Sequence, residues 1–307
     1  MATKKKMLQA AAGNATGGAA LDITDVFSTY LYKDNYSTQT ITNGIDLAGE
    51  GGLVWIKDRN STASHNFTDT ERGAGKFVRS NRTDAQITQS DTITSFNSDG
   101  FSLGNDSGNF GFAYNGSDYA SWTFRKAPKF FTCLTYTGTG SAQNISHDLG
   151  VAPGCIIVKK YSGDQNWAVY HRSLGAGKII NLNRTNAASD NTSVWNSTAP
   201  TSSSFSVSTS NNSNQLGETY VAYLFAHNDG DGEFGPDGDQ DIIKCGSYTG
   251  TDAAGNQVDL GFEPQFVMVK GASTTGNWGI YDTMRGFTAS AENQQALFAN
   301  DSSDELS

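Results

Sequence analysis

One stretch of sequence recurs three times along the chain and constrains the fold more than any other feature. Each copy is a short apolar run ending in lysine, and the three copies are Gly52–Lys57, Gly154–Lys159 and Gln265–Lys270. Self-similarity of this kind means that one structural unit is used repeatedly. We therefore expect units of roughly 100 residues each, two of them complete and the third partial.

Other positions keep the same register relative to the repeated lysines. The two matching columns, in the order of the units, are His65, Trp167 and Trp278, and then Asp69, His171 and Asp282. An aromatic run that we interpret as a closing strand follows at 119–124 and 220–225, and no such run follows in the third unit. The apolar strand is kept while its polar neighbours change, which indicates a repeated scaffold.

The composition favours an all-β fold. Short runs rich in Val, Ile, Phe, Tyr and Trp alternate with intervals of Asn, Ser, Thr and Gly, a pattern typical of strands bounded by turns. The strands expected in the second unit are 131–136, 143–147, 154–160, 166–171, 178–184, 203–208 and 219–226. The predicted fold is a tandem of antiparallel β-sandwich units, jelly-roll-like, with a short N-terminal arm.

The chain divides at shifts in composition. The expected segments are an arm at 1–26, unit 1 at 27–127, unit 2 at 128–228, an acidic Gly/Asp linker at 229–241 and a partial unit 3 at 242–307. Because an unpaired sheet edge invites aggregation, we expect either that the polypeptide continues beyond Ser307 or that a partner supplies the missing strands. We favour the first.

Charge and cysteine usage exclude several classes of partner. A net charge of −10 disfavours nucleic acid, whose phosphates are bound by basic side chains. No run approaches the ~18 apolar residues of a membrane span, so no membrane insertion is expected. Cys133, Cys155 and Cys245 are scattered over the units and lack the spacing of a disulfide framework or zinc site. We expect them to be small buried strand residues in a protein assembled in a reducing cytoplasm.

The linker contains the candidate metal ligands. The carboxylates proposed for calcium are Asp229, Asp231, Asp237 and Asp239, which alternate with other residues along the segment. The EF-hand pattern does not fit, because Gln240 stands where its bidentate Glu belongs. We favour a solvated acidic linker that allows units 2 and 3 to lie at an angle, with calcium binding as the alternative, and no other cofactor is indicated.

The repeat argues against an enzyme. Asp69, Glu71, Asp84 and Asp282 suggest the paired acids of a glycosidase, which needs two carboxyl groups at a defined separation. Unit 2 has His171 in place of the first aspartate, so the pair is not kept. No two histidines are equivalent, and a histidine-based triad or metal cluster is therefore not expected.

Aromatic residues offer a binding function instead. Trp167, Tyr170 and Trp278 lie near strand ends, where aromatic rings are able to stack on sugar faces. Packing in the core explains them about as well. Because His65 replaces tryptophan in unit 1 and a buried indole site rarely accepts imidazole without a void, we expect partial exposure, which would allow these rings to contact a glycan.

Four segments carry a resemblance to a known group of proteins. The runs Gly52–Lys57, Ser95–Gly104, Ala120–Pro128 and Gly235–Asp241 resemble the repeated domains of virion proteins from marine tailed bacteriophages, notably those of cyanobacteria. That group is described loosely as tail-fibre or structural protein. The resemblance covers nearly the whole chain after the arm and implies a particle component, while it supplies no catalytic residues.

The expected function follows from the repeat and the resemblance together. We expect a non-enzymatic virion protein, assembled in the host cytoplasm, that forms a homo-oligomeric tail fibre or appendage and contacts other tail or capsid proteins. The residues expected to anchor the arm are Lys4, Lys5, Lys6, Met7 and Leu8. Units that contact mainly their neighbours would give a fibre its reach. The alternatives are a capsid-decorating protein and a carbohydrate-binding or depolymerising receptor module that contacts host-surface glycan.

Overall fold

The computed structural model describes residues 20–114, 116–253, 255–288 and 294–306. Antiparallel sheets make up nearly all of the regular secondary structure in these residues, which confirms the predicted all-β class. A single turn of α-helix, α2 (Ile23–Val26), leads directly into the first strand. Among the described residues, no helix has the length and apolar character that crossing a membrane requires.

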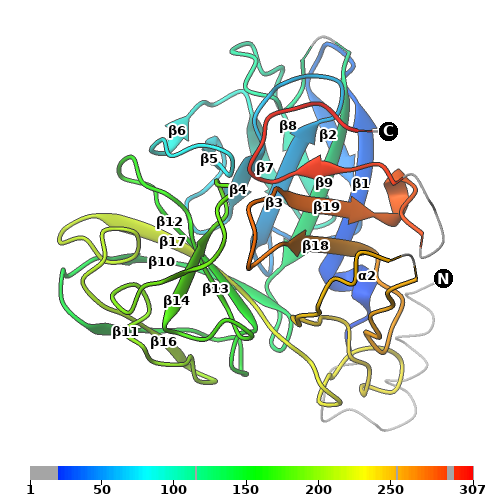
Figure 1. Ribbon diagram of the computed structural model, residues 1–307. Helices are drawn as coiled ribbons and strands as arrows, with labels where there is room; N and C mark the ends of the chain where they lie inside the picture. The colour runs from blue at the N-terminus through cyan, green and yellow to red at the C-terminus, as the bar shows by residue number, and fades with distance from the viewer. Residues whose placement is uncertain (1–19, 115, 254, 289–293, 307) are drawn as a thin grey trace, which may run out of the picture.

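Unit 1 is a two-layer sandwich (Figure 1). Its larger sheet contains, in spatial order, β1 (Phe27–Lys33), β9 (Asp118–Arg125), β3 (Gly52–Asp58), β4 (Asn66–Asp69), β5 (Lys76–Arg79) and β6 (Ile87–Thr88). The smaller sheet contains β2 (Gln39–Thr42), β8 (Gly100–Leu103) and β7 (Ile93–Asn97). Ile41 and Phe101 of the smaller sheet pack on Val54 and Ile56 of the larger one, and this contact forms the core of unit 1.

Unit 2 repeats this arrangement. Its larger sheet contains β10 (Phe131–Thr137), β17 (Thr219–Phe225), β12 (Cys155–Lys160), β13 (Ala168–His171), β14 (Lys178–Asn181) and β15 (Ser189–Asp190). The smaller sheet pairs β11 (Gln143–Ser146) with β16 (Ser204–Val207). All seven strands expected in this unit are present. The additional strand, β15, is two polar residues on the sheet edge, and its sequence lacks the apolar alternation that predicts a strand.

The repeated apolar run is the central strand of each unit. Every residue of β3 and of β12 is buried. Side chains alternate between the two faces of a strand, so Ile156 points into the sandwich of unit 2 while Ile157 joins a second core on the outer face. A continuous apolar run is required because both faces of the larger sheet are covered.

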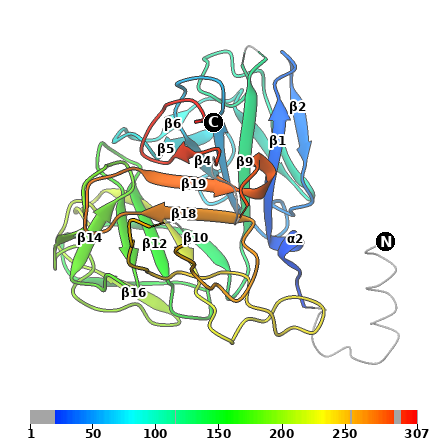
Figure 2. The ribbon, with the colours of Figure 1, turned by 45° about the vertical axis from the view of Figure 1, so that its right-hand side comes forward.

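Unit 3 is a smaller sheet of β18 (Phe266–Lys270), β19 (Trp278–Asp282) and β20 (Leu297–Phe298), with a 3₁₀ turn, η1 (Thr283–Arg285). Figure 2 shows this sheet lying across the larger sheets of units 1 and 2. The second core lies where the three units meet, and it includes Trp122, Trp167 and Trp278. The outer faces of the larger sheets are therefore the surfaces that join the units.

The acidic segment 229–241 is folded onto its neighbours. Phe234 is buried in the shared core, and its backbone pairs with Leu21 and Gln240. Lys129 forms an ion pair of 2.7 Å with Glu233. The expected picture of a solvated linker is therefore wrong for the middle of this segment, because an aromatic side chain that we overlooked ties it to the core.

Candidate functional site at the interfaces between units

The same backbone hydrogen bond joins each pair of units. The donor N and acceptor O atoms are Gln86 and Tyr161 (2.8 Å), Ala188 and Ala272 (2.9 Å), and Glu305 and Arg59 (2.9 Å). The three donors occupy one position of the repeat, and the three acceptors each follow the repeated lysine at the same distance. Since the last bond returns from unit 3 to unit 1, the units close into a ring. The expected linear array is wrong for the described residues.

The repeated lysine is part of the interface. Lys159 Nζ donates to Thr83 O of unit 1 (2.7 Å) and to Gln165 O of its own unit (2.9 Å). Lys270 makes the equivalent bond to Thr185 O of unit 2 (3.0 Å). Burial lowers the pKa of Lys159 to about 7 and that of Lys57 to about 8. Lys159 and Lys270 therefore join neighbouring units, whereas Lys57 donates to Ser61 O (2.9 Å) of its own unit.

Replacing Lys159 by methionine should flatten the alkaline stability profile. The pKa of Lys159 is about 7 in the folded protein, against 10.5 for the free side chain. Between pH 7 and pH 10.5 this lysine therefore binds a proton in the unfolded chain but not in the folded one. The stability contributed at this position thus falls as pH drops from 10.5 towards 7, by up to roughly 5 kcal/mol, and is flat below pH 7. Urea unfolding at pH 7 and pH 10 should show a smaller difference for Lys159→Met than for wild type. The exposed Lys178→Met is the control, and identical profiles for Lys159→Met and wild type would contradict this account.

The tryptophan column is buried at the same interfaces. Trp167 Nε1 donates to the backbone oxygens of Arg79 and Arg82 in unit 1, both at 3.1 Å. Trp278 Nε1 donates to Asn181 O of unit 2 (2.9 Å). The partial exposure that we expected is wrong, because these indoles fill the shared core.

Tyr170, the third candidate for glycan contact, is also buried. It packs in the sandwich core of unit 2, with its ring edge-on to Trp195 at 6.0 Å. Trp167 and Trp278 therefore present no ring face on which a sugar could stack, and Tyr170, at 5% exposure, only borders a hollow that Arg172 and His227 also line.

Unit 1 accommodates histidine in the tryptophan column because a neighbouring position changes with it. Trp55 stands where Ile157 and Met268 stand in the other units, and its Nε1 donates to His65 Nδ1 (3.0 Å). Burial lowers the pKa of His65 well below its ordinary value, and Lys57 adds to the effect. The space left by the smaller ring is filled from the adjacent strand, so the substitution does not indicate exposure.

Replacing Trp167 by phenylalanine tests the interfacial role of the indole. The variant keeps an aromatic ring but removes the N–H that Arg82 O accepts, whereas Arg79 O still accepts from Arg82 N (3.1 Å). From the lost hydrogen bond and the smaller ring we expect a loss of about 1 to 3 kcal/mol in the free energy of unfolding. Urea denaturation followed by circular dichroism measures this loss. Tyr36→Phe is the exposed control and should be neutral. An unchanged stability for Trp167→Phe would show that the indole N–H contributes nothing.

The aspartate column forms buried ion pairs. Asp69 accepts from Arg72 Nε (2.7 Å) and from the hydroxyl of Tyr223 in unit 2 (2.7 Å). Arg72 also donates to Phe67 O (2.9 Å). Although burial opposes it, the neighbouring carboxylate raises the pKa of Arg72 above its ordinary value. Both charged groups therefore have hydrogen-bond partners inside the protein.

Unit 3 repeats the pair against unit 1. Asp282 accepts from Arg285 Nε (2.6 Å) and from Trp122 Nε1 (2.9 Å). Arg285 also lies over the Trp122 ring, 5.4 Å from its centre, and donates to Glu305 (2.9 Å). Trp122 and Tyr223 occupy the same position of the two closing strands. In both units, then, a carboxylate binds the aromatic donor of the next unit in the ring.

Unit 2 departs from this arrangement. His171 replaces the aspartate and Leu174 stands in the arginine position. The Nδ1 atom of His171 accepts from Ser173 N (3.2 Å), and no bond from an aromatic donor of unit 3 accompanies it among the described residues. Burial lowers the pKa of His171. Unit 2 therefore lacks the ion pair at the contact where its aromatic partner would come from a closing strand of unit 3. No such strand is present among the described residues.

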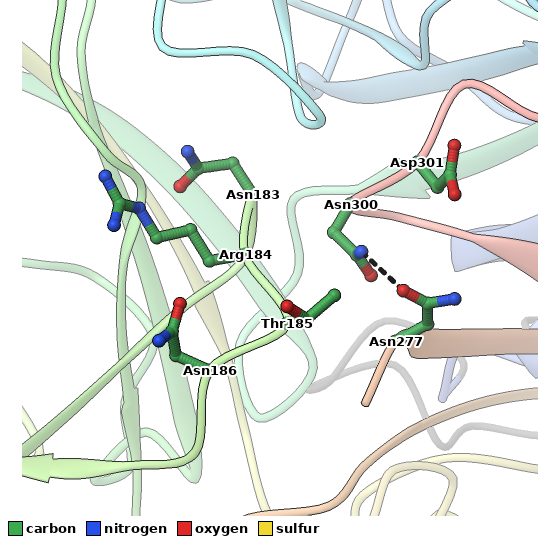
Figure 3. A pocket seen from close by; sticks show the side chains of 7 residues that line it. All are labelled: Asn183, Arg184, Thr185, Asn186, Asn277, Asn300 and Asp301. Carbon is green, nitrogen blue, oxygen red and sulfur yellow. Dashed lines mark hydrogen bonds between the residues drawn. The ribbon is translucent and has the colours of Figure 1, made fainter. Parts of the chain in front are cut away.

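A polar hollow lies between units 2 and 3 (Figure 3). It has a volume of about 450 Å³, and its lining residues are Asn183, Arg184, Thr185, Asn186, Asn277, Asn300 and Asp301. Asn300 donates to Asn277 (2.8 Å), and Arg184 Nε donates to Asn166 (2.8 Å). The lining lacks a paired nucleophile and base, and it lacks an aromatic face. It provides hydrogen-bonding groups but no arrangement for chemistry.

The candidate calcium ligands do not converge. Asp229 pairs with Lys244 (3.1 Å), whereas Asp237 and Asp239 are exposed. Within the described ranges, no group of three or more His, Cys, Asp or Glu side chains is placed to hold a metal ion. The candidate calcium cluster is therefore not formed by these side chains.

The remaining sequence predictions have separate outcomes. The anchoring residues Lys4, Lys5, Lys6, Met7 and Leu8 lie outside the described residues. All three cysteines are free thiols; Cys133 and Cys155 are buried in strands as expected, whereas Cys245 is half-buried and lies outside any strand.

The fold and interfaces define an all-β protein in which two sandwich units and a third, single-sheet unit close into a ring. The chain belongs to the family described as "Domain of unknown function (DUF7483)", which matches residues 22–307. No curated protein matches the chain.

Proposed function

We propose that the chain is a non-enzymatic structural component of a tailed phage particle, a tail fibre or appendage that assembles with other virion proteins. One observation carries the proposal: the polar residues that recur in the repeat are used inside the molecule to join its units. Lys159, Trp167 and Asp69 each bind a neighbouring unit. A repeat whose polar residues bind neighbouring units is suited to a structural role. The resemblance to phage virion repeats supports the same conclusion.

The carboxylates support the non-enzymatic part of the proposal. A general acid or base must come within hydrogen-bond reach of its substrate. Asp69 and Asp282 are instead buried, and each is bound by an arginine and an aromatic donor. A depolymerising activity would need other acids, and the repeat offers no second pair.

Closure of the ring favours a second candidate, the capsid-decorating protein. An elongated fibre gains reach when its units contact only adjacent ones. Here unit 3 contacts unit 1 directly, through Glu305 and Arg59. A compact module of this kind is suited to a broad attachment on a shell as well as to the tip of an appendage.

The position and copy number of the chain in an intact particle test both candidates. We expect a reconstruction of particles purified from the encoding phage to place the chain at the tail, and a location on the capsid would select the alternative. A chain that lacks residues 1–19 should not be incorporated into particles. Alanine replacement of Leu216, which is exposed on unit 2, should leave incorporation unchanged. Absence of wild-type chain from purified particles would contradict the proposal.

A further inference from the structure

The sheet of unit 3 has an open edge where units 1 and 2 have a strand. In those units the central strand lies between two neighbours, β3 between β9 and β4, and β12 between β17 and β13. In the described residues, β18 pairs with β19 alone. Each residue of β18 is half-buried, whereas every residue of β3 and β12 is buried. The apolar side chains of β18 thus lack the cover that their equivalents have.

A second segment of unit 3 lacks the same neighbour. The closing strands β9 and β17 also pair with β1 and β10 on their other side. The residues of unit 3 that correspond to β10 are 243–249, since Cys245 and Tyr248 match Cys133 and Tyr136. This segment forms no strand, and Figures 1 and 2 both place it on the side of β18 away from β19. A strand placed at the open position would therefore lie between β18 and residues 243–249.

The start of this segment is already in the position that β10 occupies. Cys133 of unit 2 lies against Gly52 of unit 1, with its Sγ 3.9 Å from the carbonyl oxygen. Cys245 of unit 3 lies against Gly154 of unit 2, which is the equivalent glycine. The segment follows the repeat at its first residues, and the strand that would pair with it is the missing part.

Side chains around the open position lack their aromatic partners. Tyr32 stacks on Tyr119 of β9 at 5.0 Å, and Tyr136 stacks on Tyr220 of β17 at 5.2 Å. The equivalent Tyr248 has no ring contact among the described residues and is 56% exposed. His171 likewise stands where the other units bind Trp122 or Tyr223. These two side chains mark where the aromatic residues of a closing strand would lie.

We propose that the open edge of β18 binds an extended polypeptide strand with the pattern Tyr-x-x-(Trp or Tyr)-x-Phe, inserted antiparallel between β18 and 243–249. In units 1 and 2 the phenylalanine of this pattern pairs with Leu53 or Cys155. In unit 3 it pairs with Phe266, and the second aromatic residue pairs with Met268, where it would reach His171 as Tyr223 reaches Asp69. The main chain supplies the affinity and the alternate aromatics supply the specificity, as in other strand additions.

The strand comes from outside residues 1–307. The arm does not supply it, because residues 1–19 contain no Tyr, Trp or Phe. The matching strands within the chain, β9 and β17, are already paired on both edges. A second copy therefore offers no free strand with this pattern.

A synthetic peptide with the sequence Asp118–Arg125 tests the proposal on the full chain. We expect saturable binding of the fluorescently labelled peptide at one site, with hydrogen-exchange protection appearing in β18 and 243–249. A peptide with alanine at the positions of Tyr119, Trp122 and Phe124 should not bind. Absence of binding by the parent peptide, equal binding by both peptides, or protection confined to other segments would overturn the proposal.

Two exposed tyrosines provide matched variants that leave the core intact. Tyr248→Ala should weaken binding of the peptide roughly two- to tenfold, the effect of losing one stacked aromatic pair. Tyr36→Ala, at a tyrosine that is 74% exposed on unit 1, should leave the affinity unchanged. Equal effects of the two changes would overturn the proposal. Protection of β18 that rises with protein concentration in the absence of peptide would show that a second copy occupies the edge, and would overturn it as well.

Discussion

Asp69→Ala is expected to lower the free energy of unfolding by about 3 to 5 kcal/mol, the usual cost of removing one partner from a buried ion pair. Arg72 would keep its charge in a site where its side chain is 1% exposed. The hydroxyl of Tyr223 in unit 2 would lose its acceptor at the same time. Urea denaturation of the purified chain measures the loss, and hydrogen exchange should show it first at the interface of units 1 and 2.

Two further variants separate the buried charge from other effects. Asp190→Ala removes an exposed partner of Lys178 and should cost less than about 1 kcal/mol. The double variant Asp69→His with Arg72→Leu copies the residues that unit 2 has at these positions, and it leaves no unpaired charge. We expect it to be more stable than Asp69→Ala. A double variant as unstable as the single one would mean that the ion pair itself, and not the stranded arginine, determines the cost.

Trp122→Ala should also cost about 3 to 5 kcal/mol, because it removes a fully buried indole from the core shared by the units. The ring packs on Trp55 at 5.2 Å and on Phe266 of unit 3 at 5.9 Å. Its N–H is the donor to Asp282, and Arg285 lies over its face. The interface of units 1 and 3 should therefore loosen first, seen as faster hydrogen exchange in β18 and β19.

Trp122→Tyr is the matched variant, because unit 2 has Tyr223 at the equivalent position and binds Asp69 through its hydroxyl at 2.7 Å. We expect it to keep more than half of the stability that Trp122→Ala loses. Trp195→Tyr, in the sandwich core of unit 2, should leave exchange at β18 and β19 unchanged. If Trp122→Ala accelerates exchange evenly over all units, the indole is not specific to this interface.

The local structure of the units could be predicted from the sequence because it depends on local patterns. The strands of unit 2 follow the apolar runs, and the buried central strand follows from the continuous run Cys155–Val158. Closure of the ring could not be predicted, since the bonds that close it join backbone atoms at positions with unlike side chains, such as Gln86, Ala188 and Glu305.

The prediction that Trp167 and Trp278 are partly exposed was wrong for a physical reason that is visible in the sequence. We considered the change from Trp167 to His65 alone, whereas Trp55 compensates for it from the adjacent strand. The buried ion pairs also had a signal that we did not use. An arginine follows the aspartate at the same interval in units 1 and 3, at Arg72 and Arg285, and is replaced by leucine in unit 2.

The backbone bond that is made three times has a consequence for growth of any larger assembly. Each unit presents two different surfaces, one to the preceding unit and one to the following unit, so the contact is head-to-tail. Such contacts produce open filaments unless the rotation closes. Here the contact closes after three units, although the contact of unit 2 with unit 3 lacks the aromatic donor that Asp69 and Asp282 bind in the other two. Growth of a larger assembly is then left to other surfaces, such as the small sheets β2–β8–β7 and β11–β16 or the open edge of β18.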